Sequence, residues 1–353
     1  MDLYAHLVRP FLFRMEPDVS HRLARPVLQS PFLCSLLSER SRTDPRLETR
    51  IGDLALRGPV GLAPGFDKYG ELTAGSSRLG FDYLVPGTIM ADPEPDLPGR
   101  TLIRLPLERA LINCMGLPSK GVEHSAHEIE RRGSAVPLVC SIGARDIDGF
   151  LRCHALIEPL SGAVELNVQC HNEDPGPFDD PSALDELLSA VVAQKRKPLF
   201  LRVNAYHDEE ERDKRLQMTA RAFSLGVDGF SAVGTFLSRT DKRLSRGRGT
   251  VTGEPLREFT LKAVNDVWNV TGGQAIIRAR GGIATGGDAY RAIAAGASTV
   301  EVFTAFVFGG WKIADKIRRE LLAKMDEDGI ASLTELRGRA HIRSDVARAT
   351  PPY

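Results

Sequence analysis

The chain contains 353 residues, 42% of them hydrophobic, and its 46 basic and 46 acidic side chains leave a formal net charge of zero. This length suits either two average domains or one α/β barrel with an extension. The balanced charge, together with the lack of basic clusters interleaved with aromatic residues, excludes a nucleic acid as the expected partner.

Hydropathy and cysteine content indicate the compartment. No apolar run approaches the roughly 20 residues that a membrane-spanning helix needs, and the first six residues lack the charged-then-apolar pattern of a signal peptide. An odd number of cysteines in mostly apolar surroundings predicts free thiols in a reducing compartment. We therefore expect a cytoplasmic protein. The five cysteines are Cys34, Cys114, Cys140, Cys153 and Cys170.

Residues 1–40 predict two short helices, because apolar residues recur at helical spacing and Pro17 is placed to begin the second helix. We interpret residues 1–45 as a helical extension and residues 46–353 as the main domain. The extension either packs against the main domain or rests on the inner face of the cell membrane. In the second case residues 1–37 would make a peripheral membrane contact.

Beyond residue 59, short apolar runs alternate with segments of helical period. Eight such β-then-α units over roughly 250 residues predict an α/β fold, a (β/α)8 TIM barrel. A doubly wound sheet is the alternative, but Gly61 and Gly65 lack the spacing of a dinucleotide-binding turn. The eight expected strands are 60–63, 83–86, 137–142, 163–168, 199–203, 229–233, 275–279 and 299–303. Helices are expected at 183–194, 214–224, 256–268 and 287–295, among other places.

One insertion interrupts the alternation between the second and third strands. Within residues 95–125, the segments 100–105 and 110–113 are short and mostly apolar. They predict a hairpin that covers the mouth of the barrel.

The fourth expected strand ends abruptly in polar residues. Asn167, Cys170, His171 and Asn172 follow its apolar half, and barrel enzymes place their reacting groups at the carboxyl ends of strands. A cysteine there can act as nucleophile, acid or base. The alternative is a strand end whose amides and thiol only close a turn.

Glycines and small hydroxyl residues follow the last two expected strands. Gly281 and Gly282 come after the seventh strand and Thr304 after the eighth, while Gly249 and Gly253 lie earlier in the chain. Backbone N–H groups exposed by such residues are typical of a phosphate site in this fold. Each glycine taken alone could equally mark a plain turn.

A metal site is not expected. His124 and His127 lie three residues apart beside Glu128, which supplies half of a metal site, but no third ligand is evident. We interpret this segment as a solvated helix.

From about residue 3 to residue 325 the chain resembles the dihydroorotate dehydrogenases, especially their membrane-associated, quinone-linked class. That class has N-terminal helices that form a quinone tunnel, and the helical extension is similar to them. The matching motifs are Gly61-Leu-Ala-Pro-Gly-Phe-Asp-Lys68, Pro86-Gly-Thr-Ile89, Leu111-Ile-Asn-Cys-Met-Gly116, Asn167-Val-Gln-Cys-His-Asn172, Gly281-Gly-Ile283, Ala294-Ala-Gly-Ala297 and Val302-Phe-Thr-Ala-Phe306.

The resemblance implies an FMN cofactor and assigns roles to individual residues. The FMN phosphate would lie between Gly253, Gly282, Phe303 and Thr304. The flavin ring would be lined by Ala63, Lys68, Thr88, Ser141, Asn167 and Arg202. A planar, carboxylated pyrimidine would be held by Asn113, Asn167, Asn172 and Thr235. The catalytic residues would be Cys170, as general base, and Lys68.

Four positions depart from the quinone-linked pattern, and Gln169, Cys114 and Arg280 are unusual too. Cys170 stands where that class has serine and the soluble class has cysteine. Arg202 replaces a lysine that meets the flavin pyrimidine edge, and the two cations differ in geometry. Ser141 replaces an asparagine near the flavin. Gly234 replaces a substrate-binding asparagine, which removes a donor and an acceptor.

The resemblance implies oxidation of dihydroorotate to orotate in pyrimidine biosynthesis, with a quinone as acceptor. Fumarate is the alternative acceptor, because a cysteine base is typical of the soluble, fumarate-using members. Two other functions stay open because of the four departures. The protein could oxidise a different cyclic amide or enone-type substrate, or it could bind flavin without catalysis.

Overall fold

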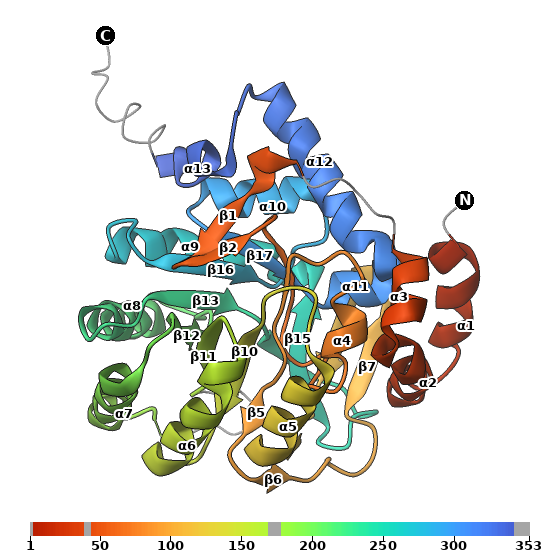
Figure 1. Cartoon of the computed structure of the whole chain (residues 1–353), viewed down its shortest axis with the longest axis horizontal. Helices are drawn as coiled ribbons and strands as arrows, with labels where there is room; N and C mark the ends of the chain where they lie inside the picture. The colour runs from red at the N-terminus through yellow and green to blue at the C-terminus, as the bar shows by residue number, and fades with distance from the viewer. Residues whose placement is uncertain (1–2, 39–43, 169–177, 342–353) are drawn as a thin grey trace.

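The computed structural model describes residues 3–38, 44–168 and 178–341. A parallel sheet curls into a barrel with helices around it (Figure 1), which confirms the predicted fold class and the eight expected strands. The second strand is interrupted at residues 85–88 and forms two pieces, β4 and β5. The strands in chain order are β3 (Val60–Leu62), β4 (Tyr83–Leu84), β5 (Ile89–Met90), β10 (Val139–Gly143), β11 (Ala163–Leu166), β12 (Leu199–Val203), β13 (Gly229–Val233), β16 (Ile276–Arg280) and β17 (Thr299–Val302).

The barrel closes because both pieces of the interrupted strand lie beside the third strand. The sheet order runs β4-β3-β17-β16-β13-β12-β11-β10-β5. The N–H of Leu84 donates to the Pro137 carbonyl at 3.1 Å, and the N–H of Ser141 donates to the Pro86 carbonyl at 2.9 Å. All the strands are parallel, so their carboxyl ends meet at one rim.

Helices cover the outside of the barrel, and short polar side chains begin several of them. Asp146, Asp180 and Asp208 each accept a hydrogen bond from a backbone N–H in the first turn, and Thr285 forms a capping box with Asp288. The helices are α4 (Thr73–Ser76), α5 (Val122–Arg132), α6 (Ile147–Ile157), α7 (Pro181–Gln194), α8 (Glu209–Ser224), α9 (Arg257–Val270), α10 (Gly286–Ala294), α11 (Thr304–Gly309), α12 (Ile313–Glu327) and α13 (Leu333–Leu336).

The N-terminal extension contains more elements than the two helices expected. It forms the π-helical turn η1 (Tyr4–Val8), then α1 (Arg9–Phe13), α2 (Pro17–Gln29) and α3 (Pro31–Leu37). The second expected helix divides because Ser30 is extended and caps α3. These helices lie beside α4, α11 and β7 (Leu102–Leu105) (Figure 1). Across the residues that the structure describes, no helix is both long and apolar enough to cross a membrane.

The insertion forms the predicted hairpin. β7 pairs with β8 (Ala110–Asn113), and β8 continues into an antiparallel sheet with two later strands, β15 (Arg248–Gly253) and β14 (Phe236–Thr240). A second hairpin, β1 (Thr49–Ile51) with β2 (Leu54–Leu56), was not predicted. It packs Ile51 and Leu56 on the barrel residues Tyr83, Val139 and Phe200.

The barrel interior holds a closed ring of four charged side chains, Glu165, Arg278, Glu301 and Arg280. Glu165 pairs with both arginines, Arg278 Nη1 lies 2.8 Å from Glu301 Oε1, and Arg280 Nε lies 3.4 Å from Glu301 Oε2. All four side chains are at most 4% exposed. Burial alone would raise the pKa of Glu165, but Arg280 and Arg278 lower it to about 2.

This depressed pKa predicts an acid-sensitive barrel. The ionised Glu165 stabilises the fold above its ordinary pKa near 4.5, and that contribution is lost as the pH falls toward about 2. Between these values the unfolding free energy of the wild type should fall more steeply than that of Glu165→Gln, by up to ~1.4 kcal/mol per pH unit. Urea unfolding at a series of pH values measures both slopes. Parallel slopes would contradict the ionised state of Glu165.

Candidate active site

A pocket opens at the carboxyl ends of the barrel strands and brings together most of the predicted site residues. The hairpin residues Leu102 and Leu111 cover it. Nine residues expected to bind cofactor or substrate line it, namely Ala63, Lys68, Asn113, Arg202, Thr235, Gly253, Gly282, Phe303 and Thr304.

The other described site residues join this pocket through a chain of hydrogen bonds. Thr88 and Ser141 are buried, and their hydroxyls lie 3.2 Å apart. Asn167 Nδ2 donates to Thr88 Oγ1 at 2.8 Å, and Asn167 Oδ1 accepts from Arg202 Nη1 at 3.3 Å. Arg202 Nη2 then donates to Thr235 Oγ1 at 3.2 Å. Residues from five separate strand ends therefore form one connected set.

One end of the pocket is a cradle that only glycines fit. Both Gly253 and Gly282 have positive φ, at 103° and 78°. A Cβ on Gly253 would lie 2.5 Å from the Arg109 carbonyl oxygen, and one on Gly282 would lie 2.4 Å from the backbone of Arg257. Thr304 faces Gly253 and begins α11. Bare backbone beside a hydroxyl is suited to a phosphate group.

Lys68 lies on the loop after β3 and enters the pocket from the other side. Its Nζ lies 3.6 Å from Met115 Sδ, and burial lowers the pKa of Lys68 below its usual range. The loop is shaped by Asp67, whose carboxylate accepts from the N–H groups of Glu71 at 3.0 Å and Leu72 at 2.9 Å. Burial raises the pKa of Asp67 to about 6.

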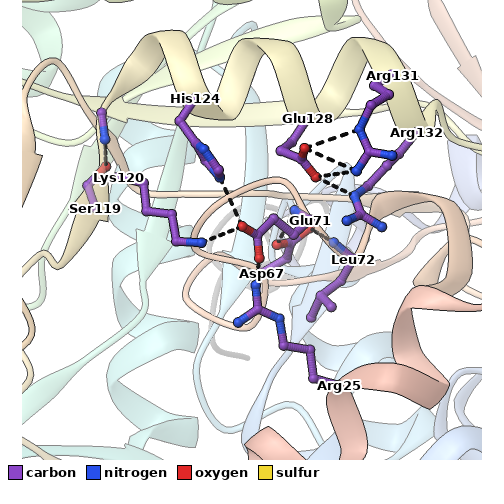
Figure 2. Close-up of polar contacts among 11 residues, drawn as sticks. Arg25, Asp67, Glu71, Leu72, Ser119, Lys120, His124, Glu128, Arg131 and Arg132 are labelled. Carbon is purple, nitrogen blue, oxygen red and sulfur yellow. Dashed lines mark hydrogen bonds and ion pairs between the residues drawn. The ribbon is translucent and has the colours of Figure 1, made fainter.

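Glu71 connects this loop to the N-terminal extension, as Figure 2 shows. Its carboxylate, 6% exposed, pairs with Arg25 of α2, with Lys120 Nζ at 2.7 Å and with His124 Nε2 at 2.9 Å. His124 therefore contacts a carboxylate that is also bound by two cations, Arg25 and Lys120. Within the described ranges, no group of three or more His, Cys, Asp or Glu side chains could hold a metal ion.

Two predicted site residues cannot be placed. Cys170, the expected base, and Asn172 lie outside the described residues. The other four cysteines are free and buried, as expected for thiols without disulfide partners. Burial raises the pKa of Cys34 to about 11 and that of Cys153 to about 12, so these two thiols are poor nucleophiles.

The pocket also contains charged residues to which the sequence analysis assigned no role. Arg280 and Glu301 line it from the barrel interior, and Arg109 lines it beside Glu254, with Arg109 Nε 2.5 Å from Glu254 Oε1. The sequence contained a signal for Arg280 and Glu301, because both are charged residues within otherwise apolar barrel strands. Arg278 and Arg280 also alternate along one strand, so their side chains must share one face of it.

A closed (β/α)8 barrel with a covered pocket at its carboxyl rim defines the class of barrel enzymes. The family profile described as dihydroorotate dehydrogenase matches residues 46–325. The chain belongs to the dihydroorotate dehydrogenase family.

Relatives match nearly the whole chain. A dihydroorotate dehydrogenase (quinone) of Roseiflexus sp. is 32% identical over 95% of this chain and 98% of its own length. A protein of the same name from Mycobacterium bovis is 31% identical over 96% of this chain and 98% of its own. The crystal structure of DHODH from Eimeria tenella in complex with ferulenol has a TM-score of 0.83 and 25% identity, covering 92% of this chain and 96% of that one.

The Glu71 contacts predict coupling between the extension and the Lys68 loop. Glu71→Ala leaves Arg25, Lys120 and His124 without their shared carboxylate and should lower the unfolding free energy by about 1.5–3 kcal/mol, because these three side chains are partly exposed and can be solvated. Hydrogen exchange should become faster in both α2 and residues 65–72. The matched control is Glu210→Ala, which breaks an exposed pair with Lys214 and should cost under about 0.5 kcal/mol. Equal losses in the two variants would contradict the coupling.

Proposed function

We propose that this protein is an FMN-dependent dehydrogenase that oxidises dihydroorotate to orotate in pyrimidine biosynthesis, with a quinone as electron acceptor. Membership of the family supports the reaction type. The observation that carries the proposal is the hydrogen-bond chain from Ser141 to Thr235, which ends in a pocket with a glycine cradle at its far side.

The described residues fit FMN. Gly253 and Gly282 line the pocket with bare backbone, and close contacts with the backbone of Arg109 and Arg257 keep side chains out of both positions, which suits a phosphate held by N–H groups. Arg202 lies at the pocket wall, and its guanidinium would offer donors to the carbonyl-rich edge of a flavin ring. When bound, FMN supplies an acceptor for a hydride.

The substrate would be held by amide and hydroxyl groups. Thr235 Oγ1 accepts from Arg202, so its own proton remains available to a ligand. Asn113 Nδ2 donates to the Thr250 carbonyl at 3.4 Å, which leaves its amide oxygen as an acceptor. Asn167 and Asn172 would complete the set. Lys68 would place a positive charge where negative charge develops during proton removal, and Cys170 would take the proton from the carbon next to the carbonyl.

Anaerobic mixing with dihydroorotate tests the reaction. Bleaching of the flavin absorbance is the expected result, and Cys170→Ala should slow it ~10²-fold or more if the thiol is the general base. Bleaching only by other cyclic amides or enone-type donors would indicate a different substrate, and no bleaching by any donor would indicate a flavin-binding protein without catalysis. Unchanged reduction in Cys170→Ala would remove this residue from the mechanism.

The helical extension supports a quinone as acceptor. Phe308 lines the pocket and packs edge-on against Phe13 of α1, with ring centroids 5.2 Å apart. Arg104 of the hairpin donates to the Met15 carbonyl at 2.7 Å. Apolar side chains of the extension thus reach the pocket wall, and an isoprenoid tail gains ~0.8 kcal/mol per buried CH₂. Fumarate is the second candidate because of the cysteine base.

The outer face of the extension supports a peripheral membrane contact. Large apolar side chains there are exposed, among them Phe32 at 71% and Leu36 at 69%. We therefore place the protein in the cytoplasm, on the inner face of the cell membrane. We also retain the division into an extension, residues 1–45, and a barrel domain, residues 46–353.

Reoxidation of the reduced flavin distinguishes the two acceptors. Wild-type protein should react faster with a short-chain quinone than with fumarate. Phe13→Ala should slow the quinone reaction severalfold, because this ring packs on the pocket residue Phe308. Phe32→Ala removes an equal ring from the exposed face and should leave the rate unchanged. Faster reoxidation by fumarate, or equal rates in the two variants, would contradict a quinone route through the extension.

A further inference from the structure

The ring of four charges inside the barrel is not explained by stability. Barrel interiors are usually filled by branched apolar side chains. Exchanging a buried ion pair for apolar residues is often neutral or stabilising, because burying charges on folding removes their hydration. In this ring four charges lose their hydration. Here the hydrogen bonding is also incomplete, since Glu165 Oε1 has no hydrogen-bond partner among the described residues. A role in the neighbouring pocket is the better explanation.

The two arginines of the ring differ in their access to that pocket. Arg278 is fully buried, and its guanidinium lies 4.4 Å from the centroid of the Phe200 ring. Arg280 lies two residues further along β16, lines the pocket and is followed by Gly281 and the cradle residue Gly282. Glu165 and Glu301 hold its guanidinium in place.

Arg280 and Arg202 both approach Gly234. A Cβ built on Gly234 would lie 3.4 Å from Arg280 Cδ and 3.5 Å from Arg202 Nη2. The space next to residue 234 is therefore occupied by two arginines. Arg202 is hydrogen-bonded to Asn167 and Thr235, and Arg280 is followed in the chain by Gly281 and the cradle residue Gly282, so the two arginines connect both proposed ends to one pocket wall.

We propose that Arg280 is a positioning residue for the reduced flavin. The guanidinium of Arg280, anchored beside Arg202, would stabilise the negative charge of the reduced ring. This inference rests on the proposed function. A hydride carries two electrons and one proton to the ring, which leaves one negative charge along its pyrimidine edge. A fixed cation there costs no reorganisation when the charge forms. Burial alone would lower the pKa of Arg280, but Glu165 and Glu301 raise it, so the cation persists.

A matched pair of double variants isolates this charge. The first variant combines Glu165→Gln with Arg280→Met, and the second combines Glu165→Gln with Arg278→Met. Each variant removes one carboxylate charge and one guanidinium from the same ring. Only the first removes the cation that lines the pocket. The midpoint potential of the bound flavin should be lower in the first variant by about 30 mV, which is a tenfold change in the equilibrium constant of a two-electron couple. Thermal melting and flavin content establish that both variants fold.

A conservative variant keeps the test decisive if the first double variant fails to fold. Arg280→Lys retains the charge but not the planar fork, so its potential should lie near that of the wild type, whereas Arg280→Gln should lower it. Equal potentials in the two double variants, or in Arg280→Lys and Arg280→Gln, overturn the inference. Dithionite can reduce the flavin without substrate. Failure to oxidise dihydroorotate with these shifts intact would therefore reject only the proposed reaction, and failure to bind flavin would reject both.

Discussion

Four charges buried inside one barrel must neutralise one another, because an unpaired ion in a protein interior costs several kcal/mol. Arg278 and Arg280 project from the same face of β16, and Glu301 is the register partner of Arg280 on the adjacent strand β17. Glu165 comes from β11, which β12 and β13 separate from β16 in the sheet. The ring therefore crosses the barrel interior, and pairing can be complete only when strands on both sides are correctly placed.

The candidate pocket adjoins this ring, because Arg280 and Glu301 line it. Asn167 follows Glu165 by two residues and continues its face of the strand toward the rim, where it joins Thr88 and Arg202. From the middle of the barrel toward its carboxyl rim, the interior therefore contains paired charges, then amides and hydroxyls, and then the open pocket. Because Arg280 is paired within the ring and Arg202 is hydrogen-bonded to Asn167 and Thr235, the orientations of both arginines are determined before any ligand is present. Such preorganised donors favour charge that develops during a reaction.

The N-terminal extension is attached to the same pocket at two places. On one side Glu71 pairs with Arg25 and lies on the loop that carries Lys68. On the other side, the Tyr4 hydroxyl donates to the Val307 carbonyl at 2.6 Å, next to the pocket residue Phe308. The extension therefore packs behind the pocket wall, although it lies outside the barrel strands (Figure 1). A substitution at the inner face of the extension should therefore alter the pocket, whereas a substitution at its exposed face should not.

Local sequence patterns determined most of the secondary structure. Alternating apolar runs and helical segments predicted all eight barrel strands, and the hairpin at residues 102–113 followed from two short apolar segments. The hairpin of β1 and β2 was missed, although Gly52 in its turn was a readable signal. The family resemblance named nine residues that the structure brings to one pocket.

Only the tertiary structure decided which of these residues contact one another. Glu165 and Arg280 are 115 residues apart in the chain, and Arg25 and Glu71 belong to different elements, so no local pattern relates either pair. The sequence by itself determined the strands, the inward faces and the glycines that a phosphate needs, since these depend on periodicity and steric limits within a few residues. The pairing of buried charges was decided by closure of the barrel, because distant strands must first meet before their side chains can neutralise one another.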